Sequence, residues 1–137
     1  MSAAQPLAGK RLIVVEDNPV VKMGVEEALR EAGASIVRSF DRKADAAILD
    51  LRLGTGITAV PIALTLTLRM VPFLFYTAQT EEAVAPLRNR WPGCKIIQKP
   101  ADGETIVAAV LELLKNPRMG VPRLTEPAVS LAEPVGG

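Results

Sequence analysis

Five short, largely apolar runs of residues limit what this chain can fold into. Runs of this length and composition are typical of strands that are buried on both faces of a parallel sheet. Most of the segments between them show the apolar spacing of amphipathic helices. We therefore predict an α/β domain with a five-stranded parallel sheet. The expected strands lie at 11–17, 35–40, 45–50, 71–77 and 94–99, and the expected helices at 20–33, 60–70, 81–93 and 102–115.

The connection between the second and third expected strands is unusually short. Only Asp41, Arg42, Lys43 and Ala44 separate the two runs. This link contains no Gly, Pro or Asn that would favour a tight hairpin. It is also far shorter than the crossover of a dozen or more residues that parallel strands usually need. We expect the helix between these two strands to be absent.

The composition excludes several kinds of chemistry. The chain has 137 residues, enough for one domain with a core, and nearly half of them are apolar. It has no histidine, which excludes histidine-based catalytic triads and histidine-ligated zinc. Its single cysteine, Cys94, cannot form an internal disulfide and fits a reducing compartment. The net charge is +1 and the charges are interspersed, so we expect no nucleic-acid partner.

The two ends of the chain contain no sign of a second domain. No apolar signal core precedes the first charges, and no apolar run approaches the ~18 residues of a membrane span. We therefore expect a cytoplasmic protein without a membrane partner. Residues 116–137 are rich in Pro, Gly, Ser and Ala without a period, and we expect them to form a mobile tail. The domain itself is expected to span residues 1–115.

Polar side chains end four of the five expected strands. The first strand ends in Glu16 and Asp17, the third in Asp50, the fourth in Thr77 and the fifth in Lys99. In parallel α/β sheets, ligands bind beyond this carboxyl edge. Crowded carboxylates repel one another, and Mg²⁺ removes that cost while leaving room for water and phosphate oxygens. A carboxylate beside Mg²⁺ can accept a phosphoryl group, whose oxygens Lys and Thr can contact.

Each of these residues alone also has a structural explanation. A strand-ending Asp can be a turn residue or helix cap, Thr is common in strands, and a Lys is usually a solvated surface residue. An acidic pair before Asn-Pro can simply favour the following helix N-terminus. The joint order of the residues favours Mg²⁺-dependent phosphoryl transfer onto an aspartate.

Four stretches, in this order, resemble the receiver domain of bacterial two-component response regulators. They are LIVVEDNP for the acidic pair, DAAILDLRL for the phosphoacceptor strand, FLFYT for the switch threonine and IIQKP for the lysine. The resemblance covers residues 10–115. The stretch VPFLFYTAQT is most similar to stand-alone receivers of alphaproteobacteria, in which Pro-Phe opens the fourth strand. The resemblance implies a flavodoxin-like receiver fold with strand order 2-1-3-4-5.

The resemblance also implies a Mg²⁺ site built from the acidic residues. Asp50 would be the phosphoacceptor and a metal ligand. Asp17 would bind the metal directly, and Glu16 would act in the same shell, in part through water. The backbone carbonyl of Arg52 would supply another ligand.

Further residues would contact the phosphoryl group. Thr77 would bond to it and relay its presence, and Lys99 would pair with one of its oxygens. Pro100 is expected to follow Lys99 through a cis peptide bond. Ile96 departs from the family, because many receivers carry Tyr or Phe at this place. The aromatic pair Phe75–Tyr76 is the candidate replacement.

In the receiver strand order, the short link must also pass the first strand. Two strand spacings (~9.6 Å) and a strand length (~17 Å) give a diagonal near ~19 Å. Five Cα steps from Phe40 to Asp45 reach at most ~18 Å. A single chain can then close only if the strand ends fray. The alternative is an intertwined homodimer in which residues 1–40 complete the domain of another chain.

We interpret the chain as a single-domain response regulator. It would accept a phosphoryl group on Asp50 from a sensor histidine kinase. It would signal by protein contact or by phosphorelay to a histidine phosphotransfer protein, and it would not be an enzyme acting on outside substrates. One alternative is a non-phosphorylated pseudo-receiver that acts as an interaction module. Another is a small Mg²⁺ phosphatase, but such an enzyme would normally carry an acidic residue two positions after the nucleophile, where this chain has Arg52.

Overall fold

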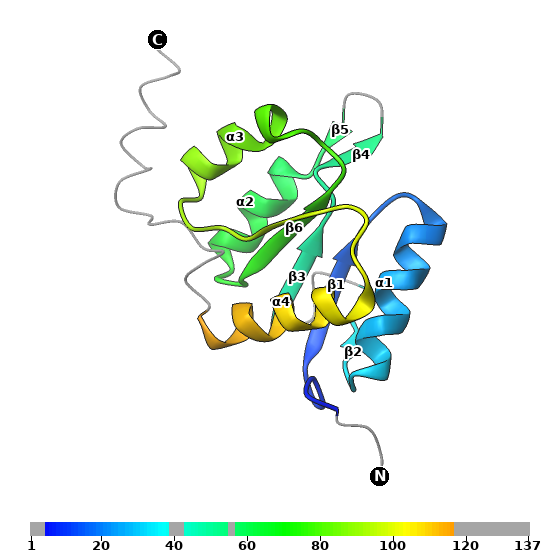
Figure 1. Ribbon diagram of the computed structural model, residues 1–137. Helices are drawn as coiled ribbons and strands as arrows, with labels where there is room; N and C mark the ends of the chain where they lie inside the picture. Colours follow the sequence, from blue (N-terminus) through cyan, green and yellow to red (C-terminus); the bar gives the residue numbers. More distant parts are fainter. Residues whose placement is uncertain (1–4, 39–42, 55–56, 117–137) are drawn as a thin grey trace.

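A five-stranded parallel sheet lies at the centre of the computed structural model, which describes residues 5–38, 43–54 and 57–116 (Figure 1). The strand order is β2-β1-β3-β6-β7, and all neighbouring strands pair in parallel. The structure therefore confirms the flavodoxin-like fold class and the predicted strand order. The strands are β1 (Arg11–Val15), β2 (Ser35–Ile36), β3 (Ala46–Leu49), β6 (Phe73–Thr77) and β7 (Ile96–Gln98).

Four helices in the described residues cover the two faces of this sheet (Figure 1). Helices α1 and α4 cover one face, where Leu29 and Val110 belong to one apolar core. Helices α2 and α3 cover the other face, where Leu66 and Val84 belong to a second core. Both faces of a parallel sheet must be buried in this way, because its strands are apolar on both sides. The helices are α1 (Pro19–Glu31), α2 (Val60–Leu68), α3 (Glu81–Arg90) and α4 (Gly103–Lys115).

Local chemistry explains where α1 begins and ends. The Asn18 side chain accepts the N–H groups of the first helical turn at 2.9 and 3.1 Å, and Pro19 occupies the start of the helix. After the helix, Gly33 has a φ of +102°, and a Cβ atom there would lie 2.9 Å from the backbone of Ala8. Only glycine fits this position without strain. These two local features bound the helix that the sequence predicts over 20–33.

A short antiparallel hairpin follows β3, in a stretch to which the sequence analysis assigned no element. Strand β4 (Arg52–Gly54) pairs with β5 (Ile57–Thr58). Strands of two or three residues are too short to show a periodic pattern, which explains why this hairpin was missed. The hairpin directs the chain from the end of β3 into α2.

The second strand is shorter than the predicted run at 35–40. Strand β2 covers only Ser35–Ile36, although the N–H of Val37 still donates to the carbonyl oxygen of Leu12 at 2.8 Å. Residues 39–42 lie outside the described part of the chain. The described residues between β2 and β3 form no helix.

The strand register shows how one chain can close over this connection. Ile36 and Ala46 both pair with Leu12, from opposite sides of β1. The chain therefore crosses about two strand spacings (~9.6 Å) without also returning along a strand. The steps from residue 36 to residue 46 can span roughly 33 Å. The estimate that disfavoured a single chain assumed a longer second strand than the structure has.

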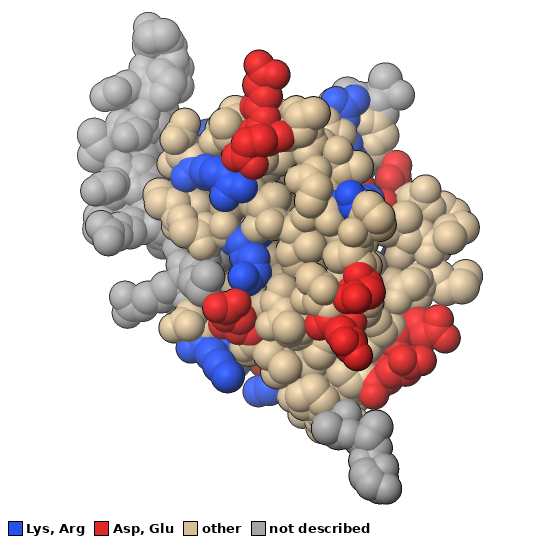
Figure 2. All heavy atoms as spheres, viewed as in Figure 1, with Lys and Arg blue, Asp and Glu red and all other residues tan. Residues whose placement is uncertain are grey.

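The outer surface carries both signs of charge. On the face shown in Figure 2, basic side chains stand apart and do not form a continuous stripe. No helix among the described residues is both long and apolar enough to span a membrane. Asn116 follows the end of α4, and the rest of the expected tail lies outside the described residues.

Candidate functional site

The ends of β1 and β3 place the predicted acidic residues side by side. Glu16 and Asp17 follow β1, and Asp50 follows β3. The N–H of Asp50 donates to the carbonyl oxygen of Val15 at 2.9 Å, so the ends of the two strands are held together. Because parallel strands end at the same edge of the sheet, all three carboxylates project from that edge.

Glu16, Asp17 and Asp50 form a compact group that we call the carboxylate cluster. One oxygen from each side chain lies within 4.8 Å of the others. Glu16 and Asp50 are buried, whereas Asp17 is exposed. Hard oxygen ligands with an open side are what Mg²⁺ prefers, since this ion keeps several water ligands. The structure thus brings together the three carboxylates that the sequence indicated.

The ammonium group of Lys99 connects two of these carboxylates. Its Nζ donates to Oε1 of Glu16 at 2.8 Å and to Oδ2 of Asp50 at 3.0 Å. Burial disfavours the charged ammonium, but the bonds to the two carboxylates outweigh burial and raise the pKa of Lys99 above its ordinary 10.5. Lys99 therefore carries a positive charge into the site at neutral pH.

Glu16 lies in a poor environment for a negative charge. Burial raises its pKa above the ordinary value of 4.5, and the nearby Asp50 carboxylate adds to the rise. Hydrogen bonds from Lys99 and from the N–H of Asn18, at 3.2 Å, oppose this rise without cancelling it. A further cation at the carboxylate cluster would favour the ionised form of Glu16.

Thr77 ends β6 beside the strand that carries Lys99, and its side chain is fully buried. Its hydroxyl oxygen accepts the N–H of Gln79 at 3.2 Å, and its carbonyl oxygen accepts the N–H of Lys99 at 2.9 Å. The backbone therefore couples Thr77 to Lys99 at the ends of two adjacent strands. The bond from Lys99 to Pro100 is cis, as predicted.

Arg52 belongs to a different local structure. It lies on β4, where it pairs with Thr58, and its side chain is exposed. The expected ligand is its backbone carbonyl, which follows Asp50 closely in the chain. Its role as a metal ligand stays a prediction.

Phe75 and Tyr76 are the candidates for the role of the aromatic residue that many receivers carry where this chain has Ile96. Both side chains are buried. The Tyr76 hydroxyl accepts the N–H of Ala101 at 3.0 Å and donates to the carbonyl oxygen of the same residue at 3.4 Å. The ring of Phe75 contacts Phe73, with ring centroids 5.6 Å apart. The Tyr76 anchor ties the segment after Pro100 to β6. Sequence reasoning missed this anchor, because a tyrosine before the threonine gives no indication of its partner.

Comparisons with known proteins give different answers for sequence and for structure. No protein-family model matches the chain, and no curated protein sequence matches it. Its fold, in contrast, matches many solved structures.

Three solved structures illustrate the match. The receiver domain of a sensor histidine kinase from Pseudomonas aeruginosa, solved with a magnesium ion in its active-site cleft, has a TM-score of 0.67 and 21% identity, covering 80% of this chain and 100% of that chain. A putative response regulator from Chloroflexus aurantiacus has a TM-score of 0.67 and 22% identity, covering 78% and 98%. The response regulator TrrA from Thermotoga maritima, in complex with Mg²⁺ and BeF, has a TM-score of 0.64 and 22% identity, covering 76% and 98%. These likenesses establish the receiver fold for this chain.

Proposed function

We propose that this chain accepts a phosphoryl group on Asp50, with Mg²⁺ as the cofactor. One observation carries this proposal: the three carboxylates lie within 4.8 Å of one another, and Lys99 bonds to both Glu16 and Asp50. The group lies at the carboxyl edge of the sheet, where ligands bind in this class of fold. Two of the solved structures with the same fold contain magnesium.

The carboxylate cluster fits Mg²⁺ by its chemistry. Glu16, Asp17 and Asp50 offer hard oxygen ligands, and the exposure of Asp17 leaves room for water and phosphate oxygens. The backbone carbonyl of Arg52 is a further proposed ligand. When bound, the ion supplies positive charge that offsets repulsion between Asp50 and an incoming phosphoryl group.

Asp50 is the proposed nucleophile. One of its carboxylate oxygens attacks the phosphorus of a phosphohistidine on a sensor kinase. The new oxygen–phosphorus bond forms as the phosphorus–nitrogen bond breaks, and the histidine nitrogen leaves with the electron pair. The product is an aspartyl phosphate on this chain and a free histidine on the kinase.

Lys99 and Thr77 would hold the transferred group. The ammonium of Lys99 already lies 3.0 Å from Oδ2 of Asp50, so a small shift would let it donate to a phosphoryl oxygen. The Thr77 hydroxyl accepts the N–H of Gln79 and keeps its own hydrogen for donation. Thr77 would then report phosphorylation to the backbone around it.

The proposed protein partners are a sensor histidine kinase and a histidine phosphotransfer protein. The chain would act as a stand-alone receiver of the alphaproteobacterial type in the cytoplasm, and its output would be protein contact or phosphorelay. Arg52 stands two residues after Asp50, where a phosphatase of this kind would normally want an acid. The chain would therefore not act as an enzyme on outside substrates.

The intertwined homodimer stays a prediction. One chain already holds Glu16, Asp17 and Asp50 together. The register around Leu12 leaves ample length for the connection between β2 and β3. Exchange of residues 1–40 between chains is therefore not required for a complete site.

Intact-mass spectrometry after incubation with acetyl phosphate and Mg²⁺ tests the proposed function. Wild type should gain one phosphoryl group, and Asp50→Asn should gain none, because it lacks the nucleophilic oxygen. A chelator should also prevent labelling. Asp45→Asn is the matched control, since Asp45 precedes the same strand at its opposite end and accepts a backbone N–H at 2.7 Å that Asn can also accept.

The outcome also decides between phosphorylation and the pseudo-receiver alternative. Labelling of Asp50→Asn at the wild-type rate would overturn the acceptor assignment. If folded wild-type protein is labelled neither by acetyl phosphate nor by its kinase, the chain is better described as a non-phosphorylated interaction module.

A further inference from the structure

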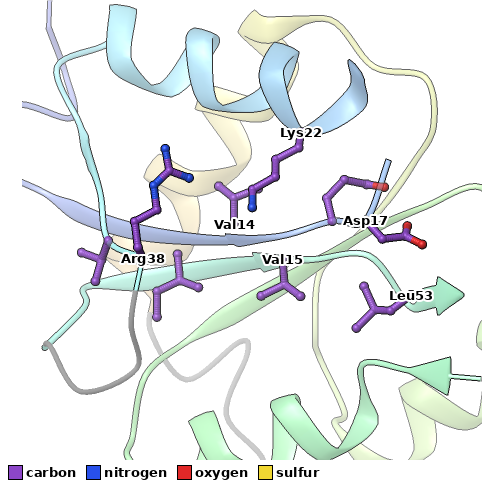
Figure 3. Close-up of a pocket in the computed structure, with 9 residues that line it drawn as sticks. Val14, Val15, Asp17, Lys22, Arg38 and Leu53 are labelled. Carbon is purple, nitrogen blue, oxygen red and sulfur yellow. The ribbon is translucent and has the colours of Figure 1, made fainter. Parts of the chain in front are cut away.

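A pocket of about 340 Å³ lies along β1, beside the carboxylate cluster (Figure 3). Strand β1 pairs with β3 over Leu12–Val15 but with β2 only at Arg11 and Leu12. Within the described residues, the stretch Ile13–Val15 therefore has no strand beside it on the β2 side. These residues line the pocket, which is thus a consequence of the short second strand.

The lining of the pocket combines an apolar floor with a charged rim. Figure 3 shows Lys22 reaching from α1 toward β1, with Arg38 at one end of the row and Asp17 at the other. The volume of the pocket lies within the range of small-molecule sites, and five of its nine lining residues are apolar. It is too small for a partner helix, which is roughly 10 Å wide. The floor residues are Ile13, Val14, Val15, Val37 and Leu53.

Two basic residues, Lys22 and Arg38, line the pocket together with the acidic Glu16 and Asp17. The buried carboxylate of Glu26 accepts from Arg38 at 2.8 Å and from Arg30 at 3.4 Å, so two cations share one anion. Lys22 is half-buried, and in the part of the chain that the structure describes its ammonium has no hydrogen bond or ion pair. A half-buried cation beside an apolar surface favours an anionic partner.

We propose that this pocket binds a small organic anion. Its compact aromatic or branched aliphatic body would lie on the floor residues, and its carboxylate, sulfonate or phosphate group would contact Lys22. The acceptor Asp50 does not line the pocket. The acceptor therefore lies outside the ligand site, although the ligand site and the phosphorylation site overlap at Glu16 and Asp17.

The two sites share residues, so their ligands should influence one another. Glu16 and Asp17 line the pocket and also belong to the carboxylate cluster. Their charges repel an organic anion, and Mg²⁺ at the cluster offsets this repulsion. Mg²⁺ should therefore strengthen anion binding, and the anion should strengthen Mg²⁺ binding by the same factor. This coupling rests on the proposed function, whereas the pocket and Lys22 do not.

Fluorescence titration with anilinonaphthalene sulfonate tests the proposal on the full chain. This probe carries an aromatic body and one sulfonate. Wild type should bind it at one site, and more tightly with Mg²⁺ than with a chelator. Lys22→Met keeps the length of the side chain but removes its charge, so we expect about tenfold weaker binding. Lys115→Met is the matched control at the exposed end of α4 and should bind like wild type.

Backbone amide shifts in a nuclear magnetic resonance titration locate the probe. They should change along Ile13–Asp17 and around Lys22 and Leu53. Equal affinity of Lys22→Met and wild type, or shifts centred on the exposed Leu68 and Met70, would overturn the proposal. Asp50→Asn keeps every residue of the pocket, so it should bind the probe even if phosphorylation fails. Probe binding that ignores Mg²⁺ would overturn the coupling alone.

Discussion

The two edge strands of the sheet are held in very different ways. Strand β2 pairs with β1 at two positions, whereas β7 pairs with β6 at three and leads directly to Lys99. Neither the carboxylate cluster nor Lys99 comes from β2. The β2 edge can therefore lose pairing and helical cover without losing a site residue. A loss of pairing at the β7 edge would displace a site residue, because Lys99 comes directly after β7.

Side-chain packing is also more extensive at the β7 edge than at the β2 edge. Trp91 precedes β7, is fully buried and contacts the ring of Phe73 at a centroid distance of 5.5 Å. Its Nε1 donates to the hydroxyl of Thr67 at 3.1 Å, which joins α2 to the end of α3. At the opposite edge, Val37 borders the open pocket. The comparison indicates that the β7 edge, which positions Lys99, is packed more firmly than the β2 edge.

The largest expected effect concerns the β7 edge and its lysine. Lys99→Met should remain folded but should lower the rate of labelling by acetyl phosphate about 10²-fold, because the transition state loses a charged donor. Initial rates from intact-mass spectra measure the change. Lys95→Met is the matched control, since Lys95 lies just before the same strand and pairs with Glu112 at 3.0 Å, away from the carboxylate cluster. An unchanged rate in Lys99→Met would remove the functional distinction between the two edges.

The second prediction compares how much a substitution at each edge lowers the free energy of unfolding. Trp91→Ala should lower the free energy of unfolding by about 3–5 kcal/mol, because it leaves a large cavity and removes the hydrogen bond that the Thr67 hydroxyl accepts. Val37→Ala should lower it by about 1–2 kcal/mol, because fewer buried groups are removed. Urea unfolding followed by circular dichroism measures both values. Equal losses would show that the β2 edge is held as firmly as the β7 edge.

The smallest expected effect concerns exchange of residues 1–40 between chains, which depends on the β2 edge. The two variant proteins Asp17→Ala and Asp50→Asn are unfolded together, refolded as a mixture and incubated with acetyl phosphate and Mg²⁺. The strand register favours closure within one chain, so we expect no recovery of labelling. Wild type refolded alone should be labelled. Partial recovery in the mixture would instead establish exchange of residues 1–40 between chains, with one intact site in each mixed dimer.

Most of the fold was predictable because its signals are local. The apolar run before Glu16 and the Asn18-Pro19 cap fixed β1 and the start of α1 without reference to distant residues. The length of β2 was not predictable from the same kind of signal. The run at 35–40 is apolar enough for a strand, but its pairing depends on where the connection to β3 must turn. The β4–β5 hairpin was missed because its strands are too short to show a period.

The sequence was enough to predict which residues form the candidate site, but not how their side chains contact one another. The position of each residue at a strand end, together with the parallel sheet, was enough to group Glu16, Asp17, Asp50, Thr77 and Lys99. The sequence could not indicate that Lys99 bridges Glu16 and Asp50. It also could not indicate that Tyr76 is anchored on Ala101. Such contacts depend on the directions of side chains from strands that are distant in sequence.

By itself, the sequence determined the order along the chain of the four helices and of the five strands of the parallel sheet, the residues at the strand ends and the absence of histidine chemistry. These properties follow from local pattern and composition, which each segment carries independently of the others. Only the tertiary structure decided where β2 stops, how Ile36 and Ala46 align on Leu12, and that a pocket lies beside the carboxylate cluster. These features arise from the competition between strand pairing and the reach of a short connection, and that competition exists only once the strands are assembled.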